Sequence, residues 1–432
     1  MSKYIINGGK KLSGEITVNS SKNATVAILI GSLLNRGITI LKNVPQIEEV
    51  NRIIEILESI GFNILRDGRK LTLQPPGKIE IGKIDIEAAK KTRSIILAIG
   101  ALCGQLQNFK IPQAGGCKLG SRTVKPHLFA LEKFGVEIKT KKDEYDVSCK
   151  KLKASEVVLY ETGDTVTENA LLAAAQVPGK SVIKMASANY MVQDLCYFLE
   201  ELGVKIKWTG AATLEVEGVK EINQDVIYEI SEDPIDAMLF ISTALTTNSD
   251  ITIKRCPIDF LELELLKLEK MGLKYEIGEK YKSKNEKTNL VDLEIKGSKL
   301  VALEDKIHAM PFPGINQDNL PFFVPIATQA KGETLIHDWT YENRAIYYSE
   351  INRLGAKITL MDPHRVEIEG PTELKGTEMV CPPALRPAAI ILVAMLGAEG
   401  KSILRNVYPI HRGYEKLEER LQSVGAEIRL EE

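Results

Sequence analysis

One pattern recurs six times along the chain and restricts the folds open to it. Each copy is a helix of apolar periodicity that ends at a glycine and runs directly into a short alternating strand, as in HLFALEKFGVEI and LCYFLEELGVKI. The glycines stand about 70 residues apart, where a helix C-cap needs a left-handed residue: Gly61, Gly135, Gly203, Gly272, Gly355 and Gly425. Units of this length are too long for a solenoid of short modules, so the pattern predicts repeated α/β units.

A second pattern precedes most copies: a small-residue helix, a turn with Gly or Asn, and a strand, as in SLLNRGITILKNV and AMLGAEGKSILRNV. The helices beginning at Ala24, Ala170 and Ala388 are almost wholly apolar, which is typical of helices buried on every side. A chain of 432 residues is also too long for one hydrophobic core. We therefore expect an α/β (α+β) protein of two similar domains with three units each.

Composition excludes several classes of function. The net charge of −2 provides no overall field that would draw the chain to nucleic acid or to an anionic membrane. No apolar window has the length of a membrane span, and the opening MSKYIINGGKKLSGEI lacks the apolar core of a signal peptide. The cysteines form no CxxC pair, so we expect free thiols, no metal site and a cytoplasmic location: Cys103, Cys117, Cys149, Cys196, Cys256 and Cys381.

The segment QAGGCKLGSRTVKPH is the most unusual in the chain. Glycines before Cys117 allow a mobile, exposed loop, and Lys118, Arg122 and Lys125 would favour its thiolate. The alternative is a glycine-rich turn with an incidental cysteine, because a free cysteine is usually a small core residue. Composition alone leaves both interpretations open.

Other basic and acidic residues stand at the starts of expected helices. Lys22 and Asn23 open the first apolar helix, where backbone N–H groups favour an anion, although Ser20 or Ser21 could simply cap that helix. Asp318 precedes a helix within PFPGINQDNLP and could be a catalytic carboxylate or an N-cap. Four arginines occupy similar junctions and would suit a phosphate ester if they converged: Arg93, Arg344, Arg386 and Arg412.

Taken together, these segments resemble the enolpyruvyl transferase family over the whole chain. The resemblance rests on GGKKLSGEITVNSSKNA, GGCKLGSR, TENALLAAA, YENR, LR and HRGYEKLEERL, in register. The spacing of 26 residues from Asp318 to Arg344, and again from Arg386 to Arg412, also fits the family. Among its branches the resemblance is closest to the one that acts on UDP-N-acetylglucosamine, and the GGCKLGSR loop argues against the shikimate-pathway branch.

The resemblance implies an inside-out α/β barrel in each domain, with helices inside and sheets outside. The expected domains are 22–229, which carries the Cys117 loop, and 1–21 plus 230–432, with the active site in the cleft between them. The implied reaction transfers the enolpyruvyl group of phosphoenolpyruvate to the 3-hydroxyl of UDP-N-acetylglucosamine and releases phosphate. That reaction is the first committed step of peptidoglycan synthesis in the bacterial cell wall, and it needs no metal or organic cofactor.

The resemblance also assigns roles to individual residues. Asp318 matches the general base, and Cys117 matches the proton donor that fosfomycin alkylates, with a role in product release as an alternative. The phosphoenolpyruvate site would comprise Lys22, Arg122 and Arg412, with Arg93, Arg344 and Arg386 in support. The nucleotide-sugar site would comprise Asn23, Arg93, Arg122, Thr123, Val124, Lys125, Pro126, Gly163, Asp164, Thr165, Asp318 and Thr340.

Three segments depart from the family, and each bears on the acceptor. Thr123-Val124-Lys125-Pro126 stands where Pro-Val-Asp-Leu is usual, and Gly163-Asp164-Thr165-Val166 stands where Ser-Val-Gly-Ala is common. The usual Asp-Arg-Ile-Glu-Thr-Gly appears as the segment 233–238, DPIDAM. These changes leave two alternatives open: transfer to a different nucleotide or nucleotide sugar, and a catalytically silent paralogue that binds a nucleotide or a protein.

Overall fold

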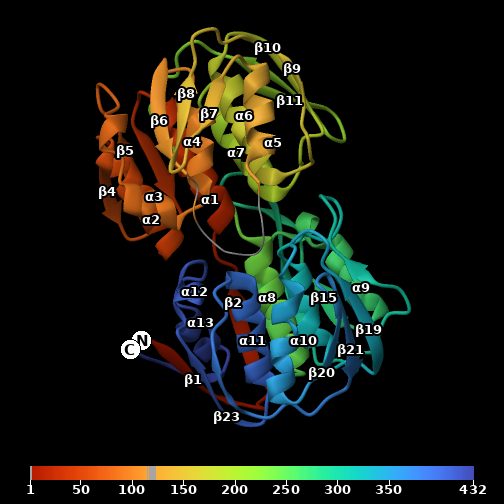
Figure 1. The fold of residues 1–432 in the computed structure, drawn as a ribbon. Coiled ribbons are helices and arrows are strands. Elements are labelled where there is room, and N and C mark those ends of the chain that lie inside the picture. Colours follow the sequence, from red (N-terminus) through yellow and green to blue (C-terminus); the bar gives the residue numbers. More distant parts are fainter. Residues whose placement is uncertain (1, 114, 116–122) are drawn as a thin grey trace. The chain divides into compact units, whose positions relative to one another are not determined.

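The computed structural model describes residues 2–113, 115 and 123–432. The chain divides into two compact units (Figure 1). The described part of the N-terminal unit is 20–113, 115 and 123–231, and that of the C-terminal unit is 2–19 and 232–432. The N-terminal strand region therefore folds with the second half of the chain.

The N-terminal unit alternates helices and short strands along the sequence. Its helices are α1 (Lys22–Gly31), α2 (Glu48–Ser59), α3 (Ile86–Lys91), α4 (Leu97–Leu102), α5 (Lys125–Lys133), α6 (Asp164–Gln176) and α7 (Tyr190–Glu201), with 3-10 turns η1 (Ser32–Leu34), η2 (Ile81–Lys83) and η3 (Ser94–Ile96). Its strands are β3 (Thr39–Lys42), β4 (Asn63–Asp67), β5 (Lys70–Gln74), β6 (Asn108–Pro112), β7 (Glu137–Thr140), β8 (Glu144–Ser148), β9 (Glu156–Val158), β10 (Gly179–Lys184), β11 (Lys205–Gly210), β12 (Thr213–Gly218) and β13 (Val226–Glu229).

The C-terminal unit has the same alternation and begins with two strands from the start of the chain. Its strands are β1 (Lys3–Gly8), β2 (Ser13–Thr17), β14 (Asp250–Cys256), β15 (Lys274–Ile277), β16 (Tyr281–Lys282), β17 (Asn289–Lys296), β18 (Ile307–His308), β19 (Gly332–His337), β20 (Lys357–Asp362), β21 (Arg365–Gly370), β22 (Glu378–Val380), β23 (Gly400–Arg405) and β24 (Glu427–Glu431). Its helices are α8 (Pro234–Thr246), α9 (Glu262–Lys270), α10 (Phe323–Ala327), α11 (Leu385–Gly397), α12 (Tyr408–His411) and α13 (Leu417–Ser423), with η4 (Ile258–Phe260), η5 (Leu320–Phe322), η6 (Ala345–Tyr347) and η7 (Ser349–Leu354).

The described residues form six small sheets, three in each unit, as six repeats require. In the N-terminal unit the strand orders are β13-β3-β5-β4, β6-β8-β7 and β9-β10-β12-β11. In the C-terminal unit they are β2-β14-β17-β15, β18-β19-β21-β20 and β22-β23-β1-β24. Strand β1 pairs antiparallel with both β23 and β24, so the start of the chain completes the sheet of the last repeat.

Helices fill the interior of each unit and sheets cover it. Almost every residue of α6, α8 and α11 is buried, whereas the strands alternate buried and exposed residues. All six repeat glycines adopt positive φ, between 89° and 108°, at the ends of their helices. The predicted fold class and the predicted C-caps are therefore confirmed.

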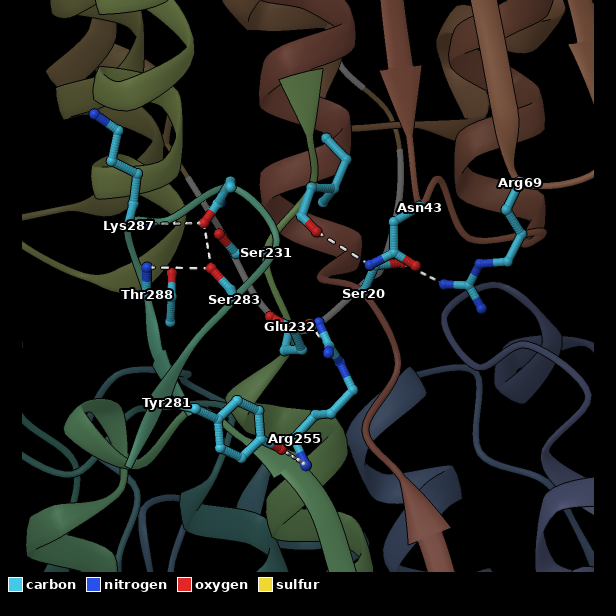
Figure 2. Close-up of polar contacts among 12 residues, drawn as sticks. Ser20, Asn43, Arg69, Ser231, Glu232, Arg255, Tyr281, Ser283, Lys287 and Thr288 are labelled. Atoms are coloured by element: carbon cyan, nitrogen blue, oxygen red, sulfur yellow. Dashed lines mark hydrogen bonds and ion pairs between the residues drawn. The ribbon is translucent and has the colours of Figure 1, made fainter. Parts of the chain in front are cut away.

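The N-terminal unit begins at Ser20 and ends at Ser231, and polar contacts hold the chain to the unit at both points. The Ser21 N–H donates to the Ser231 carbonyl at 2.8 Å. Arg69 Nη2 donates to Ser20 Oγ at 2.6 Å (Figure 2), and Ser231 Oγ donates to the buried Asp194 carboxylate at 2.7 Å. Both segments are thereby fixed to the unit up to its last residue.

On the C-terminal side, the same two segments are fixed in a similar way. The Asp233 N–H donates to the Asn19 carbonyl at 2.8 Å. Glu232, which is 3% exposed, accepts hydrogen bonds from the Arg255 guanidinium (Figure 2). Within each unit, therefore, one backbone hydrogen bond joins the segment near residue 20 to the segment near residue 232.

Candidate active site

Side-chain hydrogen bonds connect the amino ends of α1, α6 and α7 in the N-terminal unit. Asn23 Nδ2, in the first turn of α1, donates to Tyr190 Oη at the start of α7, at 3.0 Å. Asp164, the first residue of α6, accepts from Asn189 Nδ2 at 3.2 Å and from Ser187 Oγ at 2.6 Å. Helix amino ends carry unpaired N–H groups and partial positive charge, so an anion is favoured at this end of the unit.

Lys22 is the first residue of α1, and Ser21 is its N-cap. The Ala24 N–H donates to Ser21 Oγ at 3.1 Å, so the capping interpretation is correct for Ser21. It does not compete with the anion-site interpretation, because the Lys22 side chain is only half-buried at the same helix end. The two interpretations concern different side chains.

Glu168 lies one turn into α6 and is 2% exposed. The pKa of its carboxyl is raised to about 8: burial is the largest cause, the negative charge of Asp164 adds to it, and the positive charge of Lys22 opposes both. A carboxyl group with this pKa is largely protonated at neutral pH. Strongly perturbed carboxyl groups gather at functional sites more often than elsewhere.

The segments with departures from the family occupy the starts of two helices. Lys125 is the exposed first residue of α5, followed by the buried Pro126 in the first turn, and Val124 is the N-cap without a side-chain cap. Arg93 Nη2 donates to the Thr123 carbonyl at 3.3 Å. This contact brings η3 and the start of α5 together.

At the start of α6, Gly163 is the N-cap and Asp164 follows as the first helical residue. Thr165 is exposed and lies 3.5 Å from His127 of α5. The Asp164 carboxylate brings a negative charge to this helix end, where an external anion would otherwise be favoured. Its charge disfavours a diphosphate there.

In the C-terminal unit, Asp318 lies between two arginines. Its Oδ2 accepts from Arg386 Nη2 at 3.2 Å, and its Oδ1 lies 3.7 Å from Arg344 Nη1. The Asp318 side chain is 22% exposed, whereas those of Arg386 and Arg344 are 7% and 1% exposed. The N-cap of η5 is Asn319, so Asp318 is not the cap that the sequence also allowed.

A buried network fixes Arg344. Its Nε and Nη2 donate to the two carboxylate oxygens of Asp338 at 2.5 and 2.9 Å, and Nη2 also donates to the Gln317 carbonyl at 2.7 Å. Tyr348 Oη donates to the same Asp338 carboxylate at 2.6 Å. Three contacts and the Tyr341 ring at 4.1 Å leave this guanidinium with a fixed orientation toward Asp318.

Arg386, the second residue of α11, donates through Nη1 to Tyr414 Oη at 2.7 Å. Burial raises the pKa of Tyr414 well above its ordinary value, so the phenol stays neutral. Arg412, the C-cap of α12, is half-buried, and Thr340 is exposed after β19. The structure thus brings Asp318, Arg344 and Arg386 together by direct contacts.

Cys117 and Arg122 lie outside the described residues. The other cysteines are buried free thiols, and burial raises the pKa of Cys149 and of Cys381 to about 12, which suits core residues. In the described part of the chain, no group of three or more His, Cys, Asp or Glu side chains could hold a metal ion. None of the helices found there has the length and hydropathy of a membrane span.

The third departure has a structural explanation. Asp233 caps α8 by accepting from the Ile235 N–H at 2.9 Å. Asp236 pairs with both Nη atoms of Arg420 at 2.7 Å and accepts from the Asn19 N–H at 2.8 Å. The segment therefore anchors α8 to α13 and to the chain that enters the unit.

Sequence reasoning missed Asp338 and Glu168. Asp338 follows β19 directly in IHDWTYENR, six residues before Arg344, and only the fold shows that the two side chains pair. Glu168 lies in TENALLAAA, just before the apolar run of α6, and its burial follows only from the fold. A charged residue in a buried stretch always needs an explanation.

Comparison with known proteins tests the resemblance to the enolpyruvyl transferase family. Residues 6–421 match the family model of EPSP synthase (3-phosphoshikimate 1-carboxyvinyltransferase). The UDP-N-acetylglucosamine 1-carboxyvinyltransferase of Treponema denticola is 33% identical, over 100% of both chains. That of Borreliella burgdorferi is 31% identical over 99% of both chains.

Solved structures agree on the fold. The enolpyruvyl transferase NikO from Streptomyces tendae superposes with a TM-score of 0.86 at 22% identity, over 99% of this chain and 98% of that one. An EPSP synthase from Acinetobacter baumannii superposes with a TM-score of 0.75 at 17% identity, over 100% of both chains. The predicted family is confirmed: the chain belongs to the EPSP synthase family of enolpyruvyl transferases.

Proposed function

We propose that this enzyme transfers the enolpyruvyl group of phosphoenolpyruvate to the 3-hydroxyl of UDP-N-acetylglucosamine, a committed step toward peptidoglycan. The names of full-length relatives support this acceptor. The observation that carries the chemistry is Asp318, a partly exposed carboxylate held by Arg386 and Arg344. A carboxylate fixed in this way is oriented to accept a proton from a substrate hydroxyl.

In the proposed first step, the sugar hydroxyl oxygen attacks C2 of phosphoenolpyruvate. Its proton passes to Asp318, and the π electrons of the C2–C3 bond take a proton at C3, for which Cys117 is the proposed donor. The product is a tetrahedral ketal that still carries the phosphate. In the second step C3 loses a proton, the C2–C3 double bond re-forms, and phosphate leaves from C2.

We assign the binding of the phosphate and carboxylate of phosphoenolpyruvate to Lys22, Arg122 and Arg412, because cations stabilise the charge that develops on the leaving phosphate. Arg93 is proposed in support. The contacts of Arg344 suit a narrower role than the sequence suggested, since its guanidinium is already engaged by Asp338, the Gln317 carbonyl and Asp318. Arg344 would therefore orient Asp318 rather than bind phosphate.

Asn23, Thr123–Pro126, Gly163–Thr165 and Thr340 are proposed to line the acceptor site. Two of these positions favour a second candidate, transfer to a different nucleotide or nucleotide sugar. Asp164 places a carboxylate at the start of α6, and Lys125 places an exposed cation at the start of α5. A carboxylate disfavours a nearby diphosphate, and a cation prefers to face an acceptor group on a base.

Phosphate release tests the two candidates. The enzyme is incubated with phosphoenolpyruvate and, in parallel, UDP-N-acetylglucosamine, UMP, other nucleoside monophosphates and other UDP-sugars. The proposal expects the highest kcat/KM with UDP-N-acetylglucosamine. Turnover with another nucleotide alone would establish the second candidate, and no turnover with any acceptor would contradict both.

The proposed place of action is the cytosol. The buried cysteines of the described chain are free thiols, and such thiols persist in a reducing compartment.

A further inference from the structure

One oxygen of the buried Glu168 carboxyl makes no hydrogen bond within the described chain. Its Oε1 has no hydrogen-bond partner among the described residues, and the side chain is 2% exposed. Leaving a polar atom in this state costs about 1–3 kcal/mol. A carboxyl group buried at this cost suggests a role beyond packing.

Two charged residues act on Glu168 from the amino ends of the interior helices. Lys22 begins α1, and its positive charge favours the ionised form of Glu168. Asp164 stands four residues earlier on α6, and its negative charge opposes ionisation. The protonation state of Glu168 is therefore coupled to the charge at the proposed phosphoenolpyruvate site.

Asp164 and Lys22 are the charged groups that shift the pKa of Glu168, and the buried Asp194 of α7 accepts hydrogen bonds from Tyr228 and Ser231. Burial raises the pKa of the Cys196 thiol on α7 well above its ordinary value, and the negative charges of Glu200 and Glu168 raise it further. The thiol therefore stays neutral. On the α5 side, His127 bonds to Asn169, the next residue of α6. The packed segment of α4 is LAIGAL. Charged residues of β10 and β12 form ion pairs with exposed partners: Lys180–Glu215, Lys184–Glu156 and Lys205–Glu217.

We propose that Glu168 is a positioning residue that sets the net charge of the Lys22 anion site. While its carboxyl is neutral, Glu168 adds no negative charge beside Lys22, which favours the substrate phosphate. Once the carboxyl ionises, Glu168 pairs electrostatically with Lys22 and weakens the binding of the anionic substrate. This inference rests on the proposed use of phosphoenolpyruvate.

The pH at which this happens follows from the burial of the group. Burial places the pKa of Glu168 at about 8, so the carboxyl is mainly neutral at pH 7 and mainly ionised above pH 9. A phosphate ester is already doubly charged in this range, because its second pKa is about 6. A change in substrate affinity between pH 7 and 9.5 therefore reports on the protein.

By linkage, the effect is reciprocal. A bound dianion beside Lys22 disfavours the Glu168 carboxylate and raises its pKa. The enzyme should therefore take up protons from solution when a phosphate binds near pH 8.5. Titration calorimetry in two buffers of different ionisation enthalpy measures this uptake, with inorganic phosphate or phosphoenolpyruvate as the probe.

The kinetic test uses Glu168→Gln, which preserves volume and cannot ionise. We measure the ratio of variant to wild-type kcat/KM for phosphoenolpyruvate as a function of pH. The ratio should rise by about tenfold between pH 7 and 9.5, since one nearby charge is removed at an effective dielectric of about 20 with salt screening. The two proteins differ at this one position, so the effects of all other groups on the pH profile cancel in the ratio.

The matched control is Glu161→Gln, which removes an exposed carboxylate just before α6 and should leave the ratio constant with pH. If the buried amide prevents folding, Glu168→Met replaces it and carries the same expectation. A ratio that is lowered equally at every pH would show a merely structural role and overturn the inference. Wild-type enzyme that turns over no acceptor would instead overturn the proposed function, and proton uptake with inorganic phosphate would then decide the inference alone.

Discussion

Two clusters of charged residues, one in each unit, hold their carboxyl groups in opposite ways. The Asp318 cluster comprises Asp318, Asp338, Arg344, Arg386 and Tyr414, and arginine contacts hold both of its carboxylates. In the Glu168 cluster, which comprises Glu168, Lys22, Asp164 and Cys196, one carboxyl oxygen of Glu168 has no hydrogen-bond partner within the described chain.

The difference separates two uses of a buried acid. Paired guanidinium groups hold a carboxylate in a fixed orientation, which suits a group that must accept a proton on every turnover. A desolvated carboxyl without such a partner changes its charge near physiological pH, which suits control of a neighbouring cation. Breaking each cluster should therefore have effects of different kinds.

The largest expected effect is on catalysis in the Asp318 cluster. Asp318→Asn keeps the shape of the side chain but removes the basic oxygen, so turnover should fall about 10³- to 10⁴-fold. Phosphoenolpyruvate should still bind, because the proposed phosphate ligands are untouched. Phosphate release and calorimetry measure the two quantities, and full activity in this variant would show that Asp318 is not the base.

The next effect is on stability in the same cluster. Arg344→Met leaves the fully buried Asp338 without its guanidinium partner, so the free energy of unfolding should fall by about 3 to 5 kcal/mol. Urea unfolding measures it, with the exposed Arg353→Met as the control. A loss below about 1 kcal/mol would mean that the network does not depend on this arginine.

In the Glu168 cluster, removal of the acid should stabilise the fold in a pH-dependent way. The folded pKa of Glu168, about 8, lies above the unfolded value near 4.3, so its contribution to stability is complete below pH 4 and is lost as pH rises to 8. Glu168→Gln should thus gain about 2 to 4 kcal/mol over wild type at pH 8.5 and much less at pH 5. Urea unfolding at both pH values measures the difference, and an equal gain at the two values would contradict the assignment.

The smallest effect concerns the acceptor. Lys125→Asp restores the carboxylate that the family usually has at the start of α5, and it should lower KM for UDP-N-acetylglucosamine by about tenfold, the worth of one charged hydrogen bond. The other acceptors serve as controls in the same phosphate-release assay. An unchanged KM would remove Lys125 from base recognition.

The sequence predicted the parts of this molecule that depend on local pattern. The six glycine C-caps and the apolar helices α1, α6 and α11 were found because each signal lies within a few residues. The pairing of Asp338 with Arg344 and the desolvation of Glu168 were missed, since both depend on which elements pack together in three dimensions. Asp318 was identified through resemblance, whereas its two arginine partners in space required the fold.

The central claim is enolpyruvyl transfer by addition and elimination, and the product formed in D₂O tests it most directly. The enzyme is incubated with phosphoenolpyruvate and UDP-N-acetylglucosamine in D₂O, and the product is examined by NMR and mass spectrometry. The account predicts a vinyl ether at the 3-oxygen of the sugar with solvent deuterium at C3 of the enolpyruvyl group. Phosphate release without a vinyl ether, or a vinyl ether free of deuterium, would contradict it.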